Sequence, residues 1–421
     1  MINRTVSRVG VYWTIGAFGV VSLAGLFLNQ LIATQLGAVA LGRFNIFLAV
    51  LIIGGQLGTV GIHGSVLFHT PKARSNGKST SRILVAALVA VSVSSLVTAG
   101  LVVGVGEVVF RSTGNDYYLS GLRAIAIGLF FYPLNKTLLS HVNGLRWIRT
   151  FSVLFAARFV LMAALVSGAV FVFDGGQHLL WVITATESLV FAALLLALRG
   201  EFKVFEKDSL FLGAVKSHFR FGLRGLLGGM LLDLNTRVDV LLLGVITGSR
   251  AVGVYSVGSL FAEGLYQFAM VARYSYDPVV THLVVEQRFE ELKELTTRAI
   301  KRNYYLVLPL VAIANVMYPF IVRLLFGQEY VGESWIVFAL LTVGLALSAG
   351  YVPFINLLQQ AGAPSRHSAL LACVAGTNIV LNLILIPAYG MTGAAVATTL
   401  AQIFLVFLLR ALARPVIGYQ L

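Results

Sequence analysis

The sequence predicts an all-α integral membrane protein of about twelve transmembrane helices, in two six-helix lobes related by a pseudo-two-fold axis along the membrane normal. Of its 421 residues, 58% are apolar and only 11% are charged, whereas a soluble domain has about 25% charged residues. The apolar residues form continuous runs of span length, unlike the roughly ten-residue alternating strands of a membrane barrel. This composition excludes a soluble or disordered protein, and the single cysteine, Cys373, excludes a disulfide scaffold.

Each span requires about 20 mostly apolar residues. In chain order we expect spans at 9–33, 44–68, 83–108, 119–141, 151–173, 178–198, 221–246, 253–278, 303–326, 335–358, 368–387 and 391–412. The first is longer than the apolar part of a signal peptide, and no cleavage pattern follows it. We therefore expect it to be retained.

The basic residues predict the orientation of these spans. The chain has 31 Lys and Arg against 17 Asp and Glu, a net charge of +14. With the N-terminus inside, 21 of the cations fall in inner loops, and the outer loops hold only Arg43, Arg111 and Arg250. This bias predicts a multi-pass protein of the cell membrane (the inner or plasma membrane) with both termini in the cytoplasm.

A weak internal repeat supports two similar halves. A shift of 211 residues superposes Gly37 on Gly248 and Gly42 on Gly253. That shift corresponds to six of twelve spans, so both halves would enter the membrane in the same direction, as parallel repeats do. We expect an N-terminal lobe at 1–198, an amphipathic cytoplasmic connector at 199–220 and a C-terminal lobe at 221–421.

A search for catalytic chemistry finds no motif that fits. Gly77-Lys78-Ser79 resembles the end of a P-loop, but the position of the first glycine is Lys72. The seven histidines show no metal-binding spacing, and no outer loop exceeds about a dozen residues. We therefore expect no catalytic residues, no cofactor, no metal and no nucleic-acid partner, and we predict that the chain is not an enzyme.

Charged residues inside the spans are the remaining signal, because such residues are costly unless they line a cavity or pair. Cations outnumber acids there, which suits an anionic cargo. We predict substrate-binding roles for Arg237, Arg123, Lys136, Arg158 and Arg273, and coupling or cavity roles for Asp239, Asp233, Glu187 and Glu263. The alternative for each is a structural ion pair.

Proton coupling would need a buried carboxylate that can change its protonation state. Glu187 and Asp239 are candidates because neither has a cation four residues away. Asp233 is not, because Arg237 lies one turn further on and would hold it ionised. Alternatively, Glu187 and Asp239 pair across helices with Arg123 or Arg158 and never titrate.

Several motifs in order resemble one transporter family. They include the Phe221-Gly222-Leu223 opening, Arg237-x-Asp239, AVGVYSVG at 251–258 and Asp277-Pro278. LGAVALGRF at 36–44, LLFGQEY at 324–330 and NIVLNLILIPAYGMTGAAVAT at 378–398 extend the match over nearly the whole chain. Together they resemble the polysaccharide-export, or O-antigen, flippases of the multidrug/oligosaccharidyl-lipid/polysaccharide exporter superfamily.

This resemblance implies two six-helix lobes around a central cavity that opens to each side in turn. It implies a flippase that moves an oligosaccharide on polyprenyl pyrophosphate from the inner to the outer leaflet, for cell-surface polysaccharide assembly. The implied partners are that lipid and the membrane lipids, with glycan polymerase machinery as a further candidate. Only Arg237 and Asp239 are carried over by position, and arginine is a natural counter-charge for a pyrophosphate.

Two other functions stay open. One is a cation-coupled small-molecule exporter of the related drug-export branch, which would favour an acid-rich first lobe; the spans of this first lobe contain Glu187, with Glu107 at an edge. The other is a membrane glycan polymerase or acyltransferase, which would usually need a long outer loop.

Overall fold

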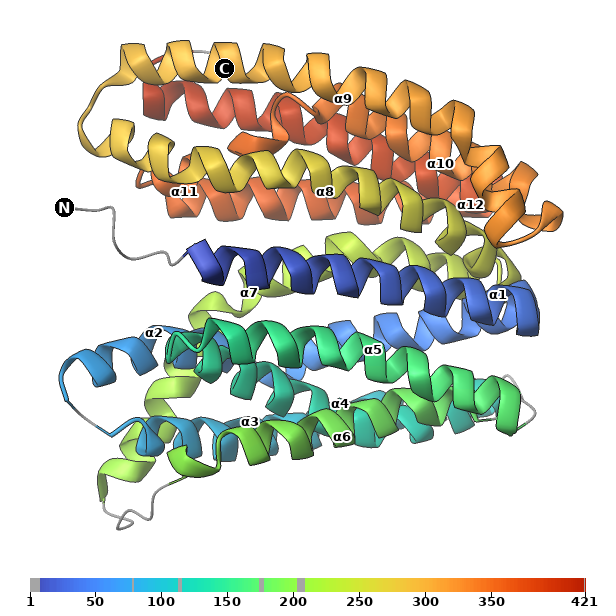
Figure 1. The fold of residues 1–421 in the computed structure, drawn as a ribbon, viewed down its shortest axis with the longest axis horizontal. Helices are drawn as coiled ribbons and strands as arrows, with labels where there is room; N and C mark the ends of the chain where they lie inside the picture. The colour runs from blue at the N-terminus through green and yellow to red at the C-terminus, as the bar shows by residue number, and fades with distance from the viewer. Residues whose placement is uncertain (1–7, 78, 113–115, 174–177, 203–208, 420) are drawn as a thin grey trace. The chain divides into compact units, whose positions relative to one another are not determined.

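The computed structural model describes residues 8–77, 79–112, 116–173, 178–202, 209–419 and 421. These residues form helices and no strand, which confirms the all-α fold class (Figure 1). The helices are α1 (Arg8–Thr59), α2 (Ile62–Ser75), α3 (Ser81–Ser112), α4 (Asp116–Gly144), α5 (Ile148–Val172), α6 (Leu179–Ala197), η1 (Arg199–Glu201), α7 (Ser209–Ile246), α8 (Ser249–Val285), α9 (Phe289–Leu325), α10 (Gln328–Ser348), η2 (Val352–Phe354), α11 (Leu357–Gln360) and α12 (Pro364–Ile417).

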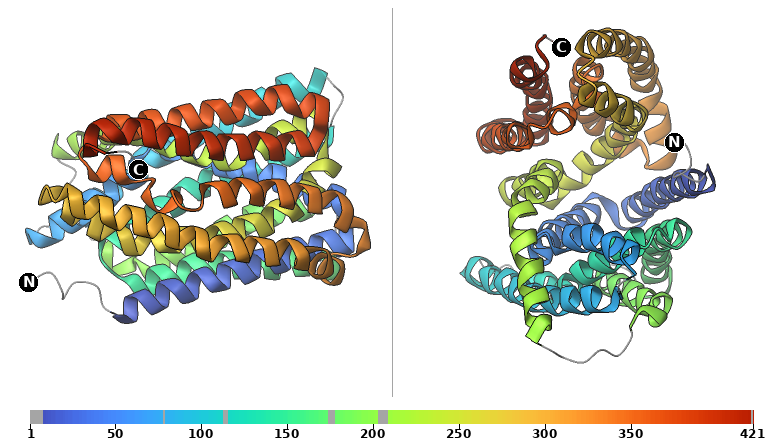
Figure 2. Two further views of the ribbon diagram at one scale, coloured as in Figure 1. Left: turned by 90° about the horizontal axis from the view of Figure 1, so that it is seen from above. Right: turned by 90° about the vertical axis from the view of Figure 1, so that its left-hand side faces the viewer.

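Eight of the helices in this described part of the chain are long and apolar enough to cross a membrane. Two of them contain a reversal. Gly37 interrupts α1 with φ 82° and ψ 175°, and Gly390 interrupts α12 with φ 56° and ψ −133°. Both φ values are positive, a region that glycine enters at little cost. Figure 2 shows the two limbs of α12 lying side by side and joined at one end.

Each of these two helices therefore accommodates two predicted spans. The charge-rich helices α7 and α8 are not among the eight apolar ones, so the number twelve stays a prediction. Two boundaries were wrong. The span expected at 335–358 extends past the end of α10 at Ser348 into η2 and α11. The span expected at 44–68 breaks at Val60 and Gly61, which have φ values of 46° and 72°. The positive φ at both residues ends α1 and starts the separate helix α2.

The chain divides into two compact units. Unit 1 comprises Met1–Leu36 and Ile46–Asp233, and unit 2 comprises Gly37–Asn45 and Leu234–Leu421. The boundary between them falls inside α7, which begins at Ser209 and continues without a break to Ile246. The described part of the expected connector therefore consists of the short helix η1 and, from Ser209 on, the start of the long helix α7. The lobe boundaries proposed from the sequence stay a prediction.

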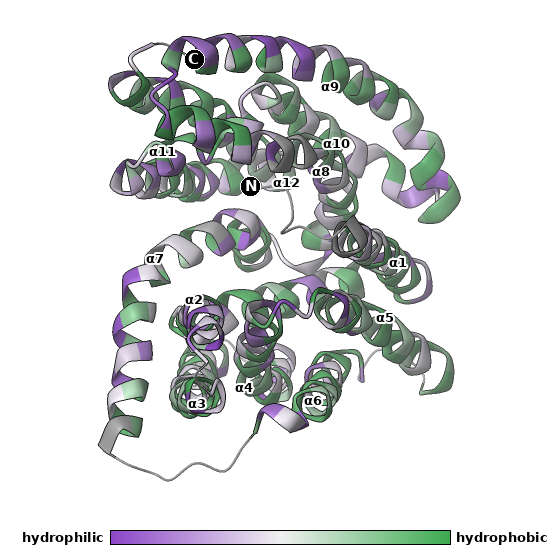
Figure 3. Ribbon diagram, turned by 60° about the vertical axis from the view of Figure 1, so that its left-hand side comes forward, coloured by the Kyte–Doolittle hydropathy of each residue, from purple (hydrophilic) through white to green (hydrophobic). Residues whose placement is uncertain are grey.

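Unit 1 is built around α4, which packs against α2, α3 and α6. Apolar side chains at helical spacing, including Leu138 and Val142 of α4 and Leu194 of α6, form its buried core. Figure 3 shows mainly hydrophobic residues in α5, whereas hydrophilic residues recur along α7.

In unit 2, α10 packs against α8, α9 and α12. A buried cluster that includes Tyr276, Leu358 and Leu409 joins α8, α11 and the second limb of α12. Many large apolar side chains of both units are exposed instead, among them Phe171 and Leu324. A soluble protein rarely exposes so much apolar surface, and in a membrane protein lipid covers it. The chain is thus a multi-pass membrane protein.

Candidate functional site

Each of the five predicted substrate-binding cations lies near a carboxylate. In unit 1, Arg123 pairs with Glu107, Lys136 with Asp233 and Arg158 with Glu187. In unit 2, Arg237 pairs with Glu263 and Arg273 with Asp277. The structure therefore gives each of the five cations an acidic neighbour, as the ion-pair alternative stated from the sequence expects.

The pair of Arg158 and Glu187 is buried inside unit 1. Glu187 of α6 is inaccessible to solvent, and the Arg158 side chain of α5 is 14% exposed. The Nδ2 atom of Asn135 donates a hydrogen bond of 3.0 Å to Oε2 of Glu187, and the guanidinium of Arg158 lies 4.3 Å from the centre of the Tyr132 ring. These contacts compensate the charges of Arg158 and Glu187 and favour the structural alternative for both residues.

Lys136 occupies a more accessible position on α4. Its Nζ atom lies 2.5 Å from Oε1 of Gln56 on α1 and 3.6 Å from Oδ2 of Asp233 on α7. The side chains of Lys136 and Asp233 are 29% and 25% exposed. Gln56 was missed in the sequence, where a lone glutamine in an apolar, glycine-rich run was its only signal. These three residues form a polar group with little net charge.

The helical spacing of Asp233 and Arg237 suggested that these two residues pair. The structure instead gives each of them a partner from another helix: Lys136 for Asp233, and Glu263 of α8 for Arg237 at 3.9 Å. Spacing along one helix shows which side chains can meet, but neighbouring helices compete for the same charges. Asp233 and Arg237 thus each lie nearest to a charge on another helix.

Asp239 is the exception among the predicted acids. It is buried in α7, and no Lys or Arg nitrogen of the described chain lies within 4.0 Å of it. Its Oδ2 atom accepts hydrogen bonds from the hydroxyls of Tyr255 at 2.7 Å and Thr398 at 2.8 Å. Asn378 donates more weakly to Oδ1 at 3.4 Å. Within the described residues, the hydrogen-bond donors to this carboxylate are therefore all neutral.

The reversal of α12 at Gly390 assembles this neutral cluster. Asn378 lies on the first limb and Thr398 on the second, so only the folded-back helix brings both to Asp239. The Oδ1 atom of Asn382 is buried nearby, next to Asn378, without a hydrogen-bond donor in the described chain. Oxygen atoms around a buried carboxylate can hold a proton or a monovalent cation, either of which would offset the cost of burying the charge.

Arg273 and Asp277 of α8 lie against the segment around α11, which connects α10 to α12. Arg273 Nε lies 3.9 Å from Oδ2 of Asp277, whose Oδ1 atom also accepts a 2.6 Å hydrogen bond from Gln360. Asn356 donates to Oδ2 at 3.3 Å. Because Asn356 and Gln360 belong to the short segment around α11, this cluster fixes a loop rather than presenting a free cation.

Arg123 occupies an exposed position on α4. It forms its ion pair with Glu107 across α4 and α3, and its side chain is 58% exposed.

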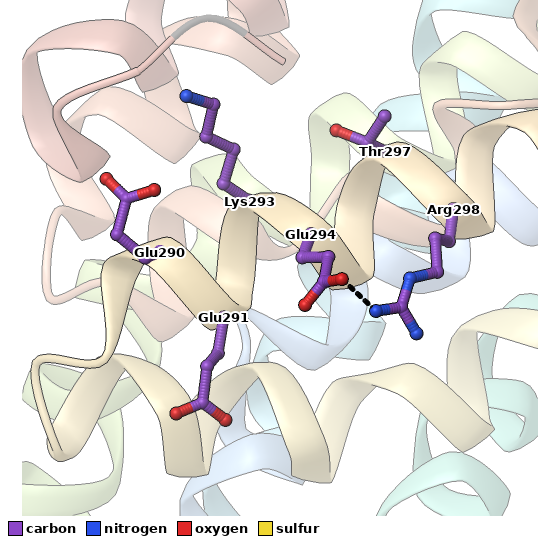
Figure 4. A pocket seen from close by; sticks show the side chains of 6 residues that line it. All are labelled: Glu290, Glu291, Lys293, Glu294, Thr297 and Arg298. Carbon is purple, nitrogen blue, oxygen red and sulfur yellow. Dashed lines mark hydrogen bonds and ion pairs between the residues drawn. The ribbon is translucent and has the colours of Figure 1, made fainter.

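A shallow surface pocket lies on the first turns of α9. The side chains of Glu290, Glu291, Lys293 and Glu294, all from this one helix, line it (Figure 4). It contains none of the candidate residues, so we do not assign the transport site to it. In the described chain no group of three or more His, Cys, Asp or Glu could hold a metal.

Comparison with known proteins gives both a family and a fold. Residues 36–334 match the family model described as polysaccharide biosynthesis protein. The probable flippase AglR of Haloferax volcanii is 24% identical over 389 residues, which cover 90% of this chain and 78% of that protein.

Among solved structures, the lipid II flippase MurJ in its inward closed conformation has a TM-score of 0.76. It is 16% identical, and the match covers 95% of this chain and 87% of that one. An inward-facing multidrug-resistance MATE transporter of the MOP superfamily has a TM-score of 0.72, with 16% identity and 94% of both chains covered. These likenesses confirm the predicted transporter fold class.

Proposed function

The chain belongs to the polysaccharide biosynthesis protein family, and on that premise we propose that it is a flippase for a lipid-linked oligosaccharide. The cargo moves from the inner to the outer leaflet by alternating access, for the assembly of cell-surface polysaccharide. The family match carries this proposal, and the curated flippase relative that spans most of the chain supports it. We further propose that the chain catalyses no reaction and uses no cofactor.

The charge pairing supports a cargo with a large neutral head. Paired side chains such as Lys136 and Asp233 still offer donors and acceptors, yet together they carry almost no net charge. Sugar hydroxyls need hydrogen-bonding partners, and a partly exposed ion pair with an adjacent amide supplies several. We propose that Lys136, Asp233 and Gln56 contact the sugar, and that Arg237 with Glu263 does so in unit 2.

Asp239 is the proposed coupling group. A carboxylate surrounded only by neutral donors is expensive to keep ionised in a membrane, so it gains most from binding a proton or a monovalent cation. An ion that binds one conformation of the transporter better than the other shifts the equilibrium between them. Glu187 is not proposed for this role, because Arg158 already compensates it.

The location of the protein is also a proposal. We place it in the cell membrane with both termini in the cytoplasm, as the distribution of Lys and Arg indicates. Reporter fusions after residues 76, 210, 290 and 364 should then be cytoplasmic, and fusions after 114, 248 and 330 external. One stable reversal among these positions would contradict the topology.

Deletion of the gene tests the function directly, with the leaflet of any accumulated lipid-linked oligosaccharide as the measurement. Accumulation on the inner leaflet, restored by the wild-type gene, supports the flippase. A normal amount of surface glycan together with increased drug sensitivity would indicate the small-molecule exporter. MATE transporters share this fold. Unpolymerised units on the outer leaflet would point to an enzyme.

A further inference from the structure

Three cations on α7 differ from the paired cations described above. Lys216, Arg220 and Arg224 are four residues apart, so they form one stripe on the helix surface, with a rise of about 6 Å between neighbours. All three side chains are exposed. Within the described residues, none of the three has a carboxylate within 4.0 Å.

The opposite face of α7 is firmly attached to unit 1. Val215 and Phe219 pack on the core cluster that contains Ile62 and Val66. Gly222 lies so close to Val60 that a Cβ atom on it would overlap the Val60 carbonyl oxygen. This packing fixes the rotation of the helix and turns the basic stripe away from the unit 1 core.

His218 adds a polar attachment to that face. Its Nδ1 atom lies 2.9 Å from the hydroxyl of Ser65, and its ring faces the ring of His69 and the backbone of Ile83. Burial, with a smaller contribution from His69, lowers the pKa of His218 to about 4. The ring is therefore neutral near pH 7, and the stripe alone supplies positive charge to this part of the helix.

The position of the stripe suits an anion that arrives at the inner membrane surface. It begins in the expected connector and ends three residues into the predicted seventh span, so it leads from the surface into the span. Arginine presents a planar fork of donors that matches phosphate oxygens, and lysine adds a point charge. Cations paired with carboxylates cannot offer the same attraction, because the acid already occupies their donors.

We propose that Lys216, Arg220 and Arg224 form a docking stripe for the phosphate group of a polyprenyl phosphate or diphosphate lipid, the lipid that carries the cargo. This inference rests on the proposed function and deepens it, because it separates the phosphate site from the sugar-binding ion pairs. The lipid-borne phosphate binds first at the inner surface, and the sugar then meets the paired residues.

The test uses the full-length protein in nanodiscs of a neutral phospholipid, titrated with a polyprenyl diphosphate and followed by intrinsic tryptophan fluorescence. The triple variant Lys216→Gln, Arg220→Gln and Arg224→Gln should bind at least about tenfold more weakly, since each tenfold corresponds to about 1.4 kcal/mol. The matched control removes three other exposed basic residues: Lys72→Gln, Arg199→Gln and Arg414→Gln. It should bind within about twofold of the wild type.

Two further ligands distinguish the source of the phosphate. Inorganic pyrophosphate and phosphatidylglycerol should each bind the wild type at least about tenfold more weakly than the polyprenyl diphosphate. Equal binding of either one overturns the assignment to a polyprenyl lipid, and unchanged binding by the triple variant overturns the stripe. A wild type that binds the lipid but does not flip it refutes the proposed function and leaves the stripe standing, so the two failures are distinguishable.

Discussion

Replacing Glu187 by glutamine should destabilise the protein rather than abolish an ion-binding step. The carboxylate is fully buried and compensates the largely buried guanidinium of Arg158. Removing one partner of a buried ion pair leaves the other charge uncompensated, which costs about 3–5 kcal/mol. Glutamine keeps an acceptor for Asn135 but carries no charge, so we expect a loss near the lower end of that range.

The free energy of unfolding can be measured by titration with sodium dodecyl sulfate in mixed micelles, using the fluorescence of the four tryptophans. The double variant Arg158→Met with Glu187→Gln should recover most of the lost stability, because no charge is then left buried. The variant Arg123→Met is a matched control: its pair with Glu107 is exposed, and such a pair contributes at most about 1 kcal/mol.

The reasoning fails if Glu187→Gln unfolds within about 0.5 kcal/mol of the wild type while flipping in proteoliposomes is lost. That result would return Glu187 to the role of a coupling carboxylate. Loss of stability together with loss of flipping, both restored in the double variant, would establish a structural pair.

Three further predictions concern unit 2. Asp239→Asn should make flipping in proteoliposomes indifferent to an imposed proton or sodium gradient that accelerates the wild type; a variant that still responds would remove Asp239 from coupling. Gly253→Ala should cost about 1–3 kcal/mol in the same unfolding assay, because the added Cβ would overlap the carbonyl oxygen of Ala38. Gly264→Ala on the same helix, with open space around it, should be neutral or stabilising; equal losses would contradict the close approach. Arg237→Ala should strongly reduce glycan export at normal protein level, with partial recovery in Arg237→Lys; normal export by the alanine variant would exclude a role in cargo binding.

The sequence by itself showed that the chain lies in a lipid bilayer, that its fold is all-α and to which family it is similar. Apolar runs of span length require lipid, and backbone groups in lipid can be satisfied within a helix, so the all-α fold followed from composition and periodicity. The resemblance carried by 221–258 is confirmed by the family match, which covers residues 36–334. Of the neutral cluster, the sequence singled out Asp239 as a candidate site residue but did not identify its donors Tyr255, Thr398 and Asn378.

Only the tertiary structure decided which side chains meet. The sequence suggested Asp233 and Arg237 as a pair, yet their partners come from α4 and α8. It left Glu187 and Asp239 equivalent, whereas packing gave Arg158 to one and three neutral donors to the other. The physical reason is that helical spacing fixes neighbours along one helix, while the pairing of charges depends on which helices pack together and where a glycine such as Gly390 turns the chain back.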